Sequence, residues 1–182
     1  MTAFIFHGTA GDPQENWFPW LRSELENKGL EAIVPKFPSP DGQSLETWLK
    51  VLEPHRSKIT PETILIGHSL GGLFALKLLE NLVQPVYLTV LVATPIGVGT
   101  IKNYAADKAF ANGFNFNWDK IKQNSKNLIV YHSDNDPYVS LENGQELAKH
   151  LGVELTFIPN AGHFNKAAGY TKFEDLLKIL TI

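Results

Sequence analysis

The fold of this chain is indicated most strongly by the sequence Thr63-Ile64-Leu65-Ile66-Gly67-His68-Ser69-Leu70-Gly71-Gly72. Its first four residues form an apolar run typical of a buried strand, and the apolar segment Leu70–Val83 predicts a helix directly after the turn. A strand, a sharp turn that carries the pattern G-x-S-x-G and a helix together make a nucleophile elbow. Because strand and helix approach closely there, the positions around Ser69 favour glycine.

The rest of the chain alternates short β-branched runs with amphipathic stretches, a pattern typical of a parallel sheet covered by helices. The predicted strands are Ala3–Phe6, Glu31–Val34, Thr63–Ile66, Val86–Val92, Asn127–His132 and Glu154–Ile158. We therefore expect an α/β fold, a three-layer α/β/α sandwich around a mostly parallel sheet of about six strands. Ligands of such sheets bind beyond the carboxyl ends of the strands, so residues that leave the strands are the candidates for function.

Three helix boundaries are indicated by capping residues and proline. The apolar spacing from Leu45 to Leu52 predicts a helix with Ser44 as its N-cap. An earlier helix is expected over Asn16–Lys28, with Pro19 in the first turn, where its missing N–H costs little. Near the C-terminal end, Thr171–Glu174 has the form of a capping box and predicts that the last helix begins there.

Length and composition predict that residues 1–182 form a single globular domain. The chain is 43% hydrophobic and 19% charged, and its net charge of −3 argues against a nucleic-acid or anionic-membrane surface, which needs clustered Lys and Arg. The absence of cysteine excludes disulfides, thiolate metal sites and cysteine nucleophiles. No signal-peptide core or membrane-length apolar run appears, so we expect a cytoplasmic protein without a membrane partner.

A serine hydroxyl needs a base to remove its proton, and the base needs a carboxylate to orient it. Downstream of Ser69, a predicted strand is followed by Asp134 and Asp136, and His163 lies just past the last predicted strand. The order Ser, acid, His is that of α/β-hydrolases. Spacing alone does not choose between the two aspartates, but Pro137 fixes the backbone after Asp136, whereas a turn aspartate such as Asp134 commonly bonds its own backbone. We favour Asp136.

The oxyanion formed by attack of Ser69 on a carbonyl needs two preorganised N–H donors. One is expected from Leu70, the residue after the nucleophile, and the other from the loop His7–Gly11, with Thr9 as its donor. A phosphate loop is the alternative reading of Gly67–Gly72, but Leu73 and Phe74 replace the Lys and Ser or Thr that such a loop requires.

The chain resembles the α/β-hydrolase superfamily and, within it, the small serine hydrolases of the retinoblastoma-binding protein nine family. The residues that carry the resemblance are His7-Gly8, Asn16-Trp17-Phe18-Pro19-Trp20-Leu21, Gly67-His68-Ser69-Leu70-Gly71-Gly72, Asp136-Pro137 and Gly162-His163-Phe164, in that order along essentially the whole chain. The resemblance implies a triad of Ser69, Asp136 and His163, and a sheet without a large cap. Retinoblastoma binding is attributed to an L-x-C-x-E-type motif, which a chain without cysteine lacks, so no protein partner is carried over.

We therefore expect a cofactor-free serine hydrolase, a carboxylesterase that acts on small acyl esters through an acyl-serine intermediate. The segment Thr94–Trp118 either walls an acyl pocket with its aromatic residues or anchors a long loop to the core. Two other functions compete with this one. The first is a metal site formed by His7, His68 and His132 with the aspartates, and the second is a catalytically silent binding module that keeps the same fold.

Overall fold

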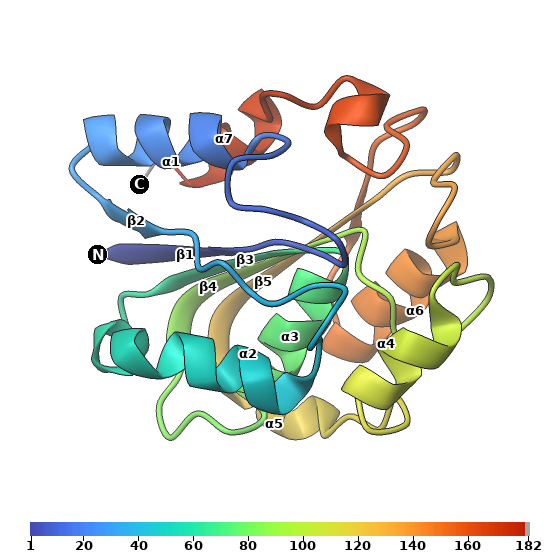
Figure 1. Ribbon diagram of the computed structural model, residues 1–182, viewed down its shortest axis with the longest axis horizontal. Helices are drawn as coiled ribbons and strands as arrows, with labels where there is room; N and C mark the ends of the chain where they lie inside the picture. Colours follow the sequence, from blue (N-terminus) through green and yellow to red (C-terminus); the bar gives the residue numbers. More distant parts are fainter. Residues whose placement is uncertain (181–182) are drawn as a thin grey trace.

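The computed structural model describes residues 1–180, and they contain one six-stranded sheet in which every neighbouring pair is parallel (Figure 1). The strands are β1 (Thr2–Phe6), β2 (Glu31–Ile33), β3 (Ile64–His68), β4 (Val86–Val92), β5 (Ser125–His132) and β6 (Leu155–Phe157). Their order across the sheet is β2-β1-β3-β4-β5-β6. The predicted α/β/α sandwich with a six-stranded sheet is confirmed.

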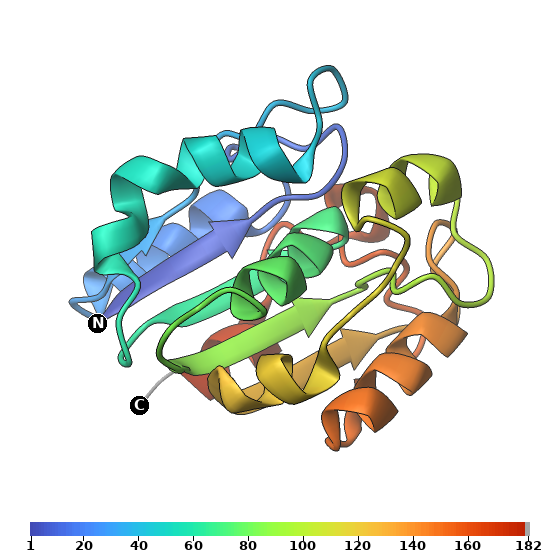
Figure 2. The ribbon, with the colours of Figure 1, turned by 90° about the horizontal axis from the view of Figure 1, so that it is seen from below.

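Helices cover both faces of the sheet (Figures 1 and 2). On one face lie α1 (Phe18–Asn27) and α7 (Glu174–Leu180), and the other face carries α2 (Leu45–Leu52), α3 (Leu70–Leu79), α4 (Tyr104–Phe110), α5 (Trp118–Gln123) and α6 (Leu141–Leu151). Short 3-10 helices span Glu53–Lys58 and Lys166–Ala168. None of the helices within residues 1–180 has the length and apolar character needed to cross a lipid bilayer.

Each face of the sheet has its own apolar core. Trp48 and Phe74 are fully buried between the sheet and α2 and α3, while Trp17, Phe18 and Phe164 are fully buried on the opposite face. Burial of side chains of this size contributes roughly 1.5–3 kcal/mol each before entropy is subtracted. The two cores hold the sheet rigid, so the loops at the ends of its strands are supported from both sides.

Capping was predicted correctly at one helix and wrongly at another. The Ser44 hydroxyl accepts a hydrogen bond from the Thr47 N–H at 3.1 Å, so Ser44 caps α2 as expected. The predicted capping box at Thr171–Glu174 is wrong, because α7 begins only at Glu174. Phe173 is buried against the rings of Tyr131 and Phe164, which places it ahead of the helix.

The strand boundaries differ from the predicted ones by a few residues. β3 extends through Gly67 to His68, two residues farther than expected, because these residues pair with Leu91 and Val92 of β4. Sheet pairing therefore continues up to the residue before Ser69. β5 begins at Ser125 rather than at residue 127, since its first residue pairs with the start of β4.

The strand order places a topological switch point between β1 and β3. From β1 the chain moves outward to β2, then returns to the other side of β1 and continues through β3, β4, β5 and β6. In open α/β sheets ligands bind at this point, outside the carboxyl ends of the strands. Here the two ends are followed by His7 and Ser69, so the fold predicts a binding site between their loops.

Candidate active site

Ser69 occupies a strained turn between β3 and α3. Its φ of 56° and ψ of −124° lie outside the ordinary regions for a residue with a side chain, which is typical of a residue held by its surroundings for function. A Cβ atom on Gly71 would lie 2.1 Å from the Phe6 carbonyl oxygen, and one on Gly72 would lie 1.9 Å from Thr94 Oγ1. The close approach of strand and helix therefore requires these glycines.

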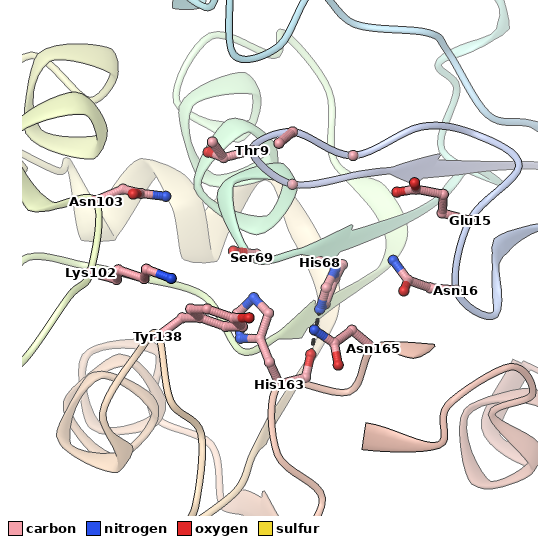
Figure 3. Close-up of a pocket in the computed structure, with 13 residues that line it drawn as sticks. Thr9, Glu15, Asn16, His68, Ser69, Lys102, Asn103, Tyr138, His163 and Asn165 are labelled. Carbon is pink, nitrogen blue, oxygen red and sulfur yellow. Dashed lines mark hydrogen bonds between the residues drawn. The ribbon is translucent and has the colours of Figure 1, made fainter. Parts of the chain in front are cut away.

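The Ser69 side chain opens into a cavity of about 330 Å³ at the switch point (Figure 3). His163 lines the same cavity, and the two side chains face it from different loops. Within residues 1–180 the Ser69 hydroxyl has no hydrogen-bond partner, so it is free to meet a substrate and the imidazole together. Such hydrogen bonds are often open in a substrate-free site and close when substrate binds. The cavity is lined by Gly8, Thr9, Ala10, Gly11, Glu15, Asn16, His68, Ser69, Lys102, Asn103, Tyr138, His163 and Asn165.

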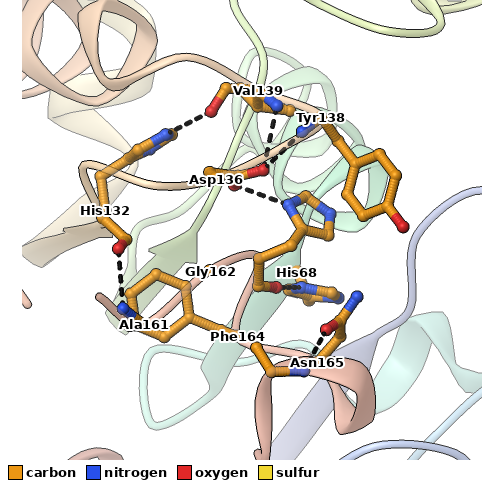
Figure 4. Close-up of polar contacts among 12 residues, drawn as sticks. His68, His132, Asp136, Tyr138, Val139, Ala161, Gly162, Phe164 and Asn165 are labelled. Carbon is orange, nitrogen blue, oxygen red and sulfur yellow. Dashed lines mark hydrogen bonds and ion pairs between the residues drawn. The ribbon is translucent and has the colours of Figure 1, made fainter. Parts of the chain in front are cut away.

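Asp136 is the carboxylate that contacts His163 (Figure 4). His163 Nδ1 donates to Asp136 Oδ2 at 2.7 Å, and the other oxygen, Oδ1, accepts the N–H groups of Tyr138 at 2.8 Å and Val139 at 3.1 Å. The Asp136 side chain is 0% exposed and that of His163 is 8% exposed. This arrangement fixes the proton on Nδ1 and leaves Nε2 of the neutral imidazole as a base.

Asp134, the competing acid, points elsewhere. Its Oδ1 accepts the N–H of Asn160 at 2.8 Å, and this hydrogen bond is the main reason that the pKa of Asp134 is lowered. As expected of a turn aspartate, the Asp134 carboxylate also interacts with the backbone N–H groups of Asp134 and Asn135, but the hydrogen bond from Asn160 reaches in addition to the loop that carries His163. Asp134 thus supports the histidine loop without contacting the imidazole.

Three consecutive residues after β5 hold this loop, and we call them the 133–135 clasp. Ser133 Oγ accepts the N–H of Ala161 at 2.9 Å, Asp134 accepts that of Asn160, and Asn135 Oδ1 accepts that of Gly162 at 2.7 Å. The held loop is strained, since φ is 58° at Asn160 and 50° at Phe164, values that residues with a side chain rarely adopt. The clasp therefore stabilises a backbone that would otherwise relax and move His163.

His68 contacts both the backbone and the ring of His163. Its Nε2–H donates to the His163 carbonyl oxygen at 2.7 Å, and its ring lies 4.8 Å from the His163 ring, centroid to centroid. Burial, with a smaller effect from His163, lowers the pKa of His68 to about 3. His68 is therefore neutral near pH 7, and it fixes the backbone of His163 without adding a charge next to the base.

His7 and His132 form hydrogen bonds with the backbone of the loops that follow β1 and β5. His7 Nδ1–H donates to the Gly8 carbonyl at 2.9 Å while its Nε2 accepts the Phe37 N–H, and His132 Nε2–H donates to the Val139 carbonyl at 2.9 Å. Burial lowers the pKa of both rings. Both ring nitrogens of His7 are engaged, and no cluster of metal-binding side chains occurs in the described part of the chain, so the metal alternative gains no support.

The loop after β1 contacts Ser69, the candidate nucleophile. A Cβ atom on Gly8 would lie 2.8 Å from Ser69 Cβ, so only glycine fits there. The Ala10 N–H donates to Ser39 Oγ at 2.7 Å and the Gly11 N–H donates to the Gly8 carbonyl at 3.1 Å, whereas the Thr9 N–H has no partner within residues 1–180. Leu70 is the first residue of α3, where N–H groups lack partners within the helix. Thr9 and Leu70 remain the candidate oxyanion donors.

Comparison with known proteins agrees with this geometry. Residues 3–182 match the protein family described as Serine hydrolase. The chain belongs to the serine hydrolase family. Its α/β-hydrolase fold and the elbow at Ser69 follow the pattern that its sequence predicts.

Two relatives and one solved structure show how far the likeness of this serine hydrolase extends. YdeN from Bacillus subtilis (strain 168) is 28% identical over 178 residues, which cover 98% of this chain and 93% of YdeN. Serine hydrolase RBBP9 from Rattus norvegicus is 28% identical over 181 residues, covering 98% of this chain and 92% of RBBP9. The crystal structure of the B. subtilis ydeN gene product matches with a TM-score of 0.90 and 27% identity, covering 99% of this chain and 96% of that chain.

In this serine hydrolase the aromatic residues of the segment from Thr94 to Trp118 do not line the cavity that contains Ser69. They pack among themselves and against the core. Phe110 contacts the Trp48 ring at 5.0 Å, Tyr104 contacts Phe114 at 5.6 Å, and Phe116 contacts Trp118 at 4.7 Å, between centroids. The anchoring alternative is the one that these contacts support. The segment contributes Lys102 and Asn103 to the cavity instead.

The clasp, the roles of His68 and His132, and Lys102 were not found from the sequence. Ser133-Asp134-Asn135 is composed of turn-forming residues, and its partners lie 26 to 28 positions away. His68 was noticed only as part of the elbow and as a candidate metal ligand. Local patterns carry no signal for such long-range hydrogen bonds, so only the placement of the strand ends by the sheet brings these groups together.

Proposed function

We propose that this serine hydrolase is a carboxylesterase that acts on small acyl esters through an acyl-Ser69 intermediate. The observation that carries the proposal is the convergence of the strained Ser69 elbow and the Asp136–His163 pair on one cavity. The two carboxylate oxygens of Asp136 are fully engaged, so the imidazole has one orientation and presents Nε2 as the base.

In the first step, Ser69 Oγ attacks the ester carbonyl carbon while its proton passes to His163 Nε2. The oxyanion accepts hydrogen bonds from the N–H groups of Leu70 and Thr9, and Asp136 stabilises the imidazolium. The bond from carbon to the alcohol oxygen then breaks, and His163 returns the proton to the leaving alcohol. The acyl group remains on Ser69.

In the second step, water replaces the alcohol. His163 Nε2 takes a proton from water as its oxygen attacks the acyl carbon, and the resulting tetrahedral intermediate is held by the same N–H groups. When the bond to Ser69 Oγ breaks, His163 returns that proton to the serine. The products are one carboxylic acid and one alcohol, and no redox partner is needed.

Labelling by a fluorophosphonate reagent tests the proposal against the silent binding module. The wild type should be labelled on Ser69 and should hydrolyse short-chain esters, whereas Ser69→Ala should do neither while its melting curve remains cooperative. The chelator EDTA should leave the wild-type rate unchanged. A protein that is neither labelled nor active on any ester would instead be a binding module, and an active Ser69→Ala variant would exclude Ser69 as the nucleophile.

A further inference from the structure

The catalytic cavity is lined by opposite charges on its two sides. Apart from the histidines, Lys102 and Glu15 are the charged residues among those that line it. Figure 3 shows Lys102 with Asn103 on one side of Ser69 and Glu15 with Asn16 on the other. A substrate bound across Ser69 therefore has one end near a cation and the other near a carboxylate.

Lys102 is held in place by the same loop that carries the catalytic acid. Its backbone N–H donates to the Tyr138 carbonyl at 2.8 Å, and the preceding residue, Ile101, pairs with Val139 in an antiparallel bridge. The Lys102 ammonium lies 4.7 Å from the centroid of the Tyr138 ring, and that ring meets the His163 ring edge-on at 4.9 Å. The Tyr138 ring therefore contacts both the Lys102 ammonium and the catalytic His163.

The charge of Lys102 is not neutralised by the protein. Within residues 1–180, no carboxylate lies within ion-pair distance of its ammonium, whereas Lys36, near the same end of the sheet, pairs with Asp12 at 3.2 Å. Tyr138 offers the ammonium only the face of its ring, which binds a cation weakly at an exposed site. A carboxylate on a bound substrate would therefore be its first anionic partner.

We propose that Lys102 recognises a carboxylate on the ester substrate, so that the preferred substrates are esters with one anionic end. The inference rests on the proposed function and names the substrate class of that same site. The Asn103 amide on the same side supplies a further donor, and Glu15 repels the carboxylate from the opposite side. Together these residues set both the preference for an anion and the direction in which the ester lies across Ser69.

Two pairs of esters of similar length test the inference. In the first pair the anionic ester carries its carboxylate on the acyl side, and in the second pair on the alcohol side. Monomethyl glutarate is compared with methyl hexanoate, and acetylated glycolate with propyl acetate. In each pair the measured quantity is the ratio of kcat/KM for the anionic ester to that for the neutral ester. Lys102→Met keeps the aliphatic stem against Tyr138 and removes the charge, and it should lower the ratio roughly five- to tenfold in at least one pair.

Three controls separate recognition of charge from a structural role. Lys102→Arg keeps the positive charge and should restore most of the preference. Added salt should lower the ratio of the wild type but not that of Lys102→Met, since only the wild type has the attraction between the ammonium and the carboxylate that salt weakens. Glu15→Gln removes the opposing carboxylate and should keep or raise the ratio.

The results that contradict the inference are distinct from those that contradict the proposed function. If neutral esters are hydrolysed with dependence on Ser69, but Lys102→Met leaves both ratios within twofold of the wild type, Lys102 does not recognise a carboxylate and the hydrolase assignment stands. A lower ratio in Glu15→Gln would also overturn the inference. If no ester is hydrolysed and Ser69 is not labelled, both proposals are wrong.

Discussion

At Asp136, one side chain performs two tasks with its two oxygens: one binds the His163 ring, and the other accepts two backbone N–H groups. Asp136→Asn should keep the fold, with the amide oxygen accepting the N–H groups of Tyr138 and Val139 and the NH2 group facing His163 Nδ1, which stabilises the wrong tautomer. We expect kcat/KM on a short ester to fall by about 10⁴-fold, as for the corresponding change in a serine protease triad. Steady-state kinetics with thermal melts as a folding control measure the loss.

The matched control for that change is Asp134→Asn. The new amide oxygen can still accept the Asn160 N–H, so the histidine loop stays in place and kcat/KM should fall by at most about tenfold, or roughly 1.4 kcal/mol of barrier. A severe loss in Asp134→Asn beside a nearly normal Asp136→Asn would reverse the roles assigned to the two aspartates.

Asp107 on α4 is a buried carboxyl that catalysis does not use. One of its oxygens, Oδ1, is buried without a partner among the described residues, and burial raises the pKa of Asp107 to about 6. Between about pH 4 and pH 6 the unfolded chain releases a proton that the folded chain keeps, so this group disfavours the folded state increasingly as the pH rises. Above pH 6 the buried charge costs a constant amount.

Asp107→Asn should therefore raise the free energy of unfolding at pH 7.5 by about 1–3 kcal/mol, and the gain should shrink towards pH 4. Urea unfolding at the two pH values measures both quantities. Asp119→Asn, in which the original carboxylate is 86% exposed, is the control and should show no such gain. A gain that is equal at both pH values would show that the effect of Asp107 is not due to its charge.

On the scale of elements, the site depends on the contact between the loops that follow β5 and β6. Ser133 is 0% exposed, and its hydroxyl both accepts the Ala161 N–H and donates to Asn135. Ser133→Ala leaves that buried N–H unpaired, which should cost roughly 1–3 kcal/mol of stability. Because the loop that carries His163 loosens, fluorophosphonate labelling of Ser69 should slow by about tenfold, about 1.4 kcal/mol of barrier.

The exposed residue Ser23 on α1 provides the control, since Ser23→Ala should change neither stability nor labelling. Labelling of Ser133→Ala is measured well below its melting temperature, so that an effect on the position of His163 is separated from an effect on global stability. Normal labelling of a folded but destabilised Ser133→Ala protein would show that the clasp supports the fold and does not position His163.

The ends of helices and strands were predicted well where neighbouring residues in the sequence determine them. They were predicted less well where pairing or packing with distant residues determines them. Ser44 was recognised as an N-cap because a short polar side chain before an apolar stripe has a local partner, Thr47. The end of β3 was missed because only its pairing with β4 extends it to His68. The start of α7 was missed because burial of Phe173 outweighs the local capping pattern.

On the scale of the whole molecule, the strand order explains why residues distant in sequence form one site. The candidates Ser69, Asp136 and His163 were all named from motifs and chain order, and the structure brings them to the same end of the sheet. The distribution of side chains around the cavity was not predictable, because it depends on which face of the segment from residue 94 to 118 turns inward. That segment contributes polar rather than aromatic side chains.

The volume of about 330 Å³ and the lack of large aliphatic side chains among the lining residues predict a preference for short acyl chains. Each methylene buried against apolar surface contributes roughly 0.8 kcal/mol, but this cavity offers little such surface beyond the first few carbons. Across a series of neutral esters, kcat/KM should be highest for acetyl to butyryl groups and should fall for longer chains, measured below the concentration at which the esters aggregate. A steady rise through long chains would mean that the segment opens as a lid.

The central claim, that Ser69 becomes acylated during turnover, is tested most directly by mass spectrometry of acid-quenched enzyme mixed with a short-chain ester. We predict an acyl adduct on the peptide that contains Ser69 in the wild type, an adduct that persists longer in His163→Gln if that variant still acylates, and no adduct in Ser69→Ala. Turnover without an adduct on Ser69, or an adduct on another residue that Ser69→Ala retains together with activity, would contradict the account.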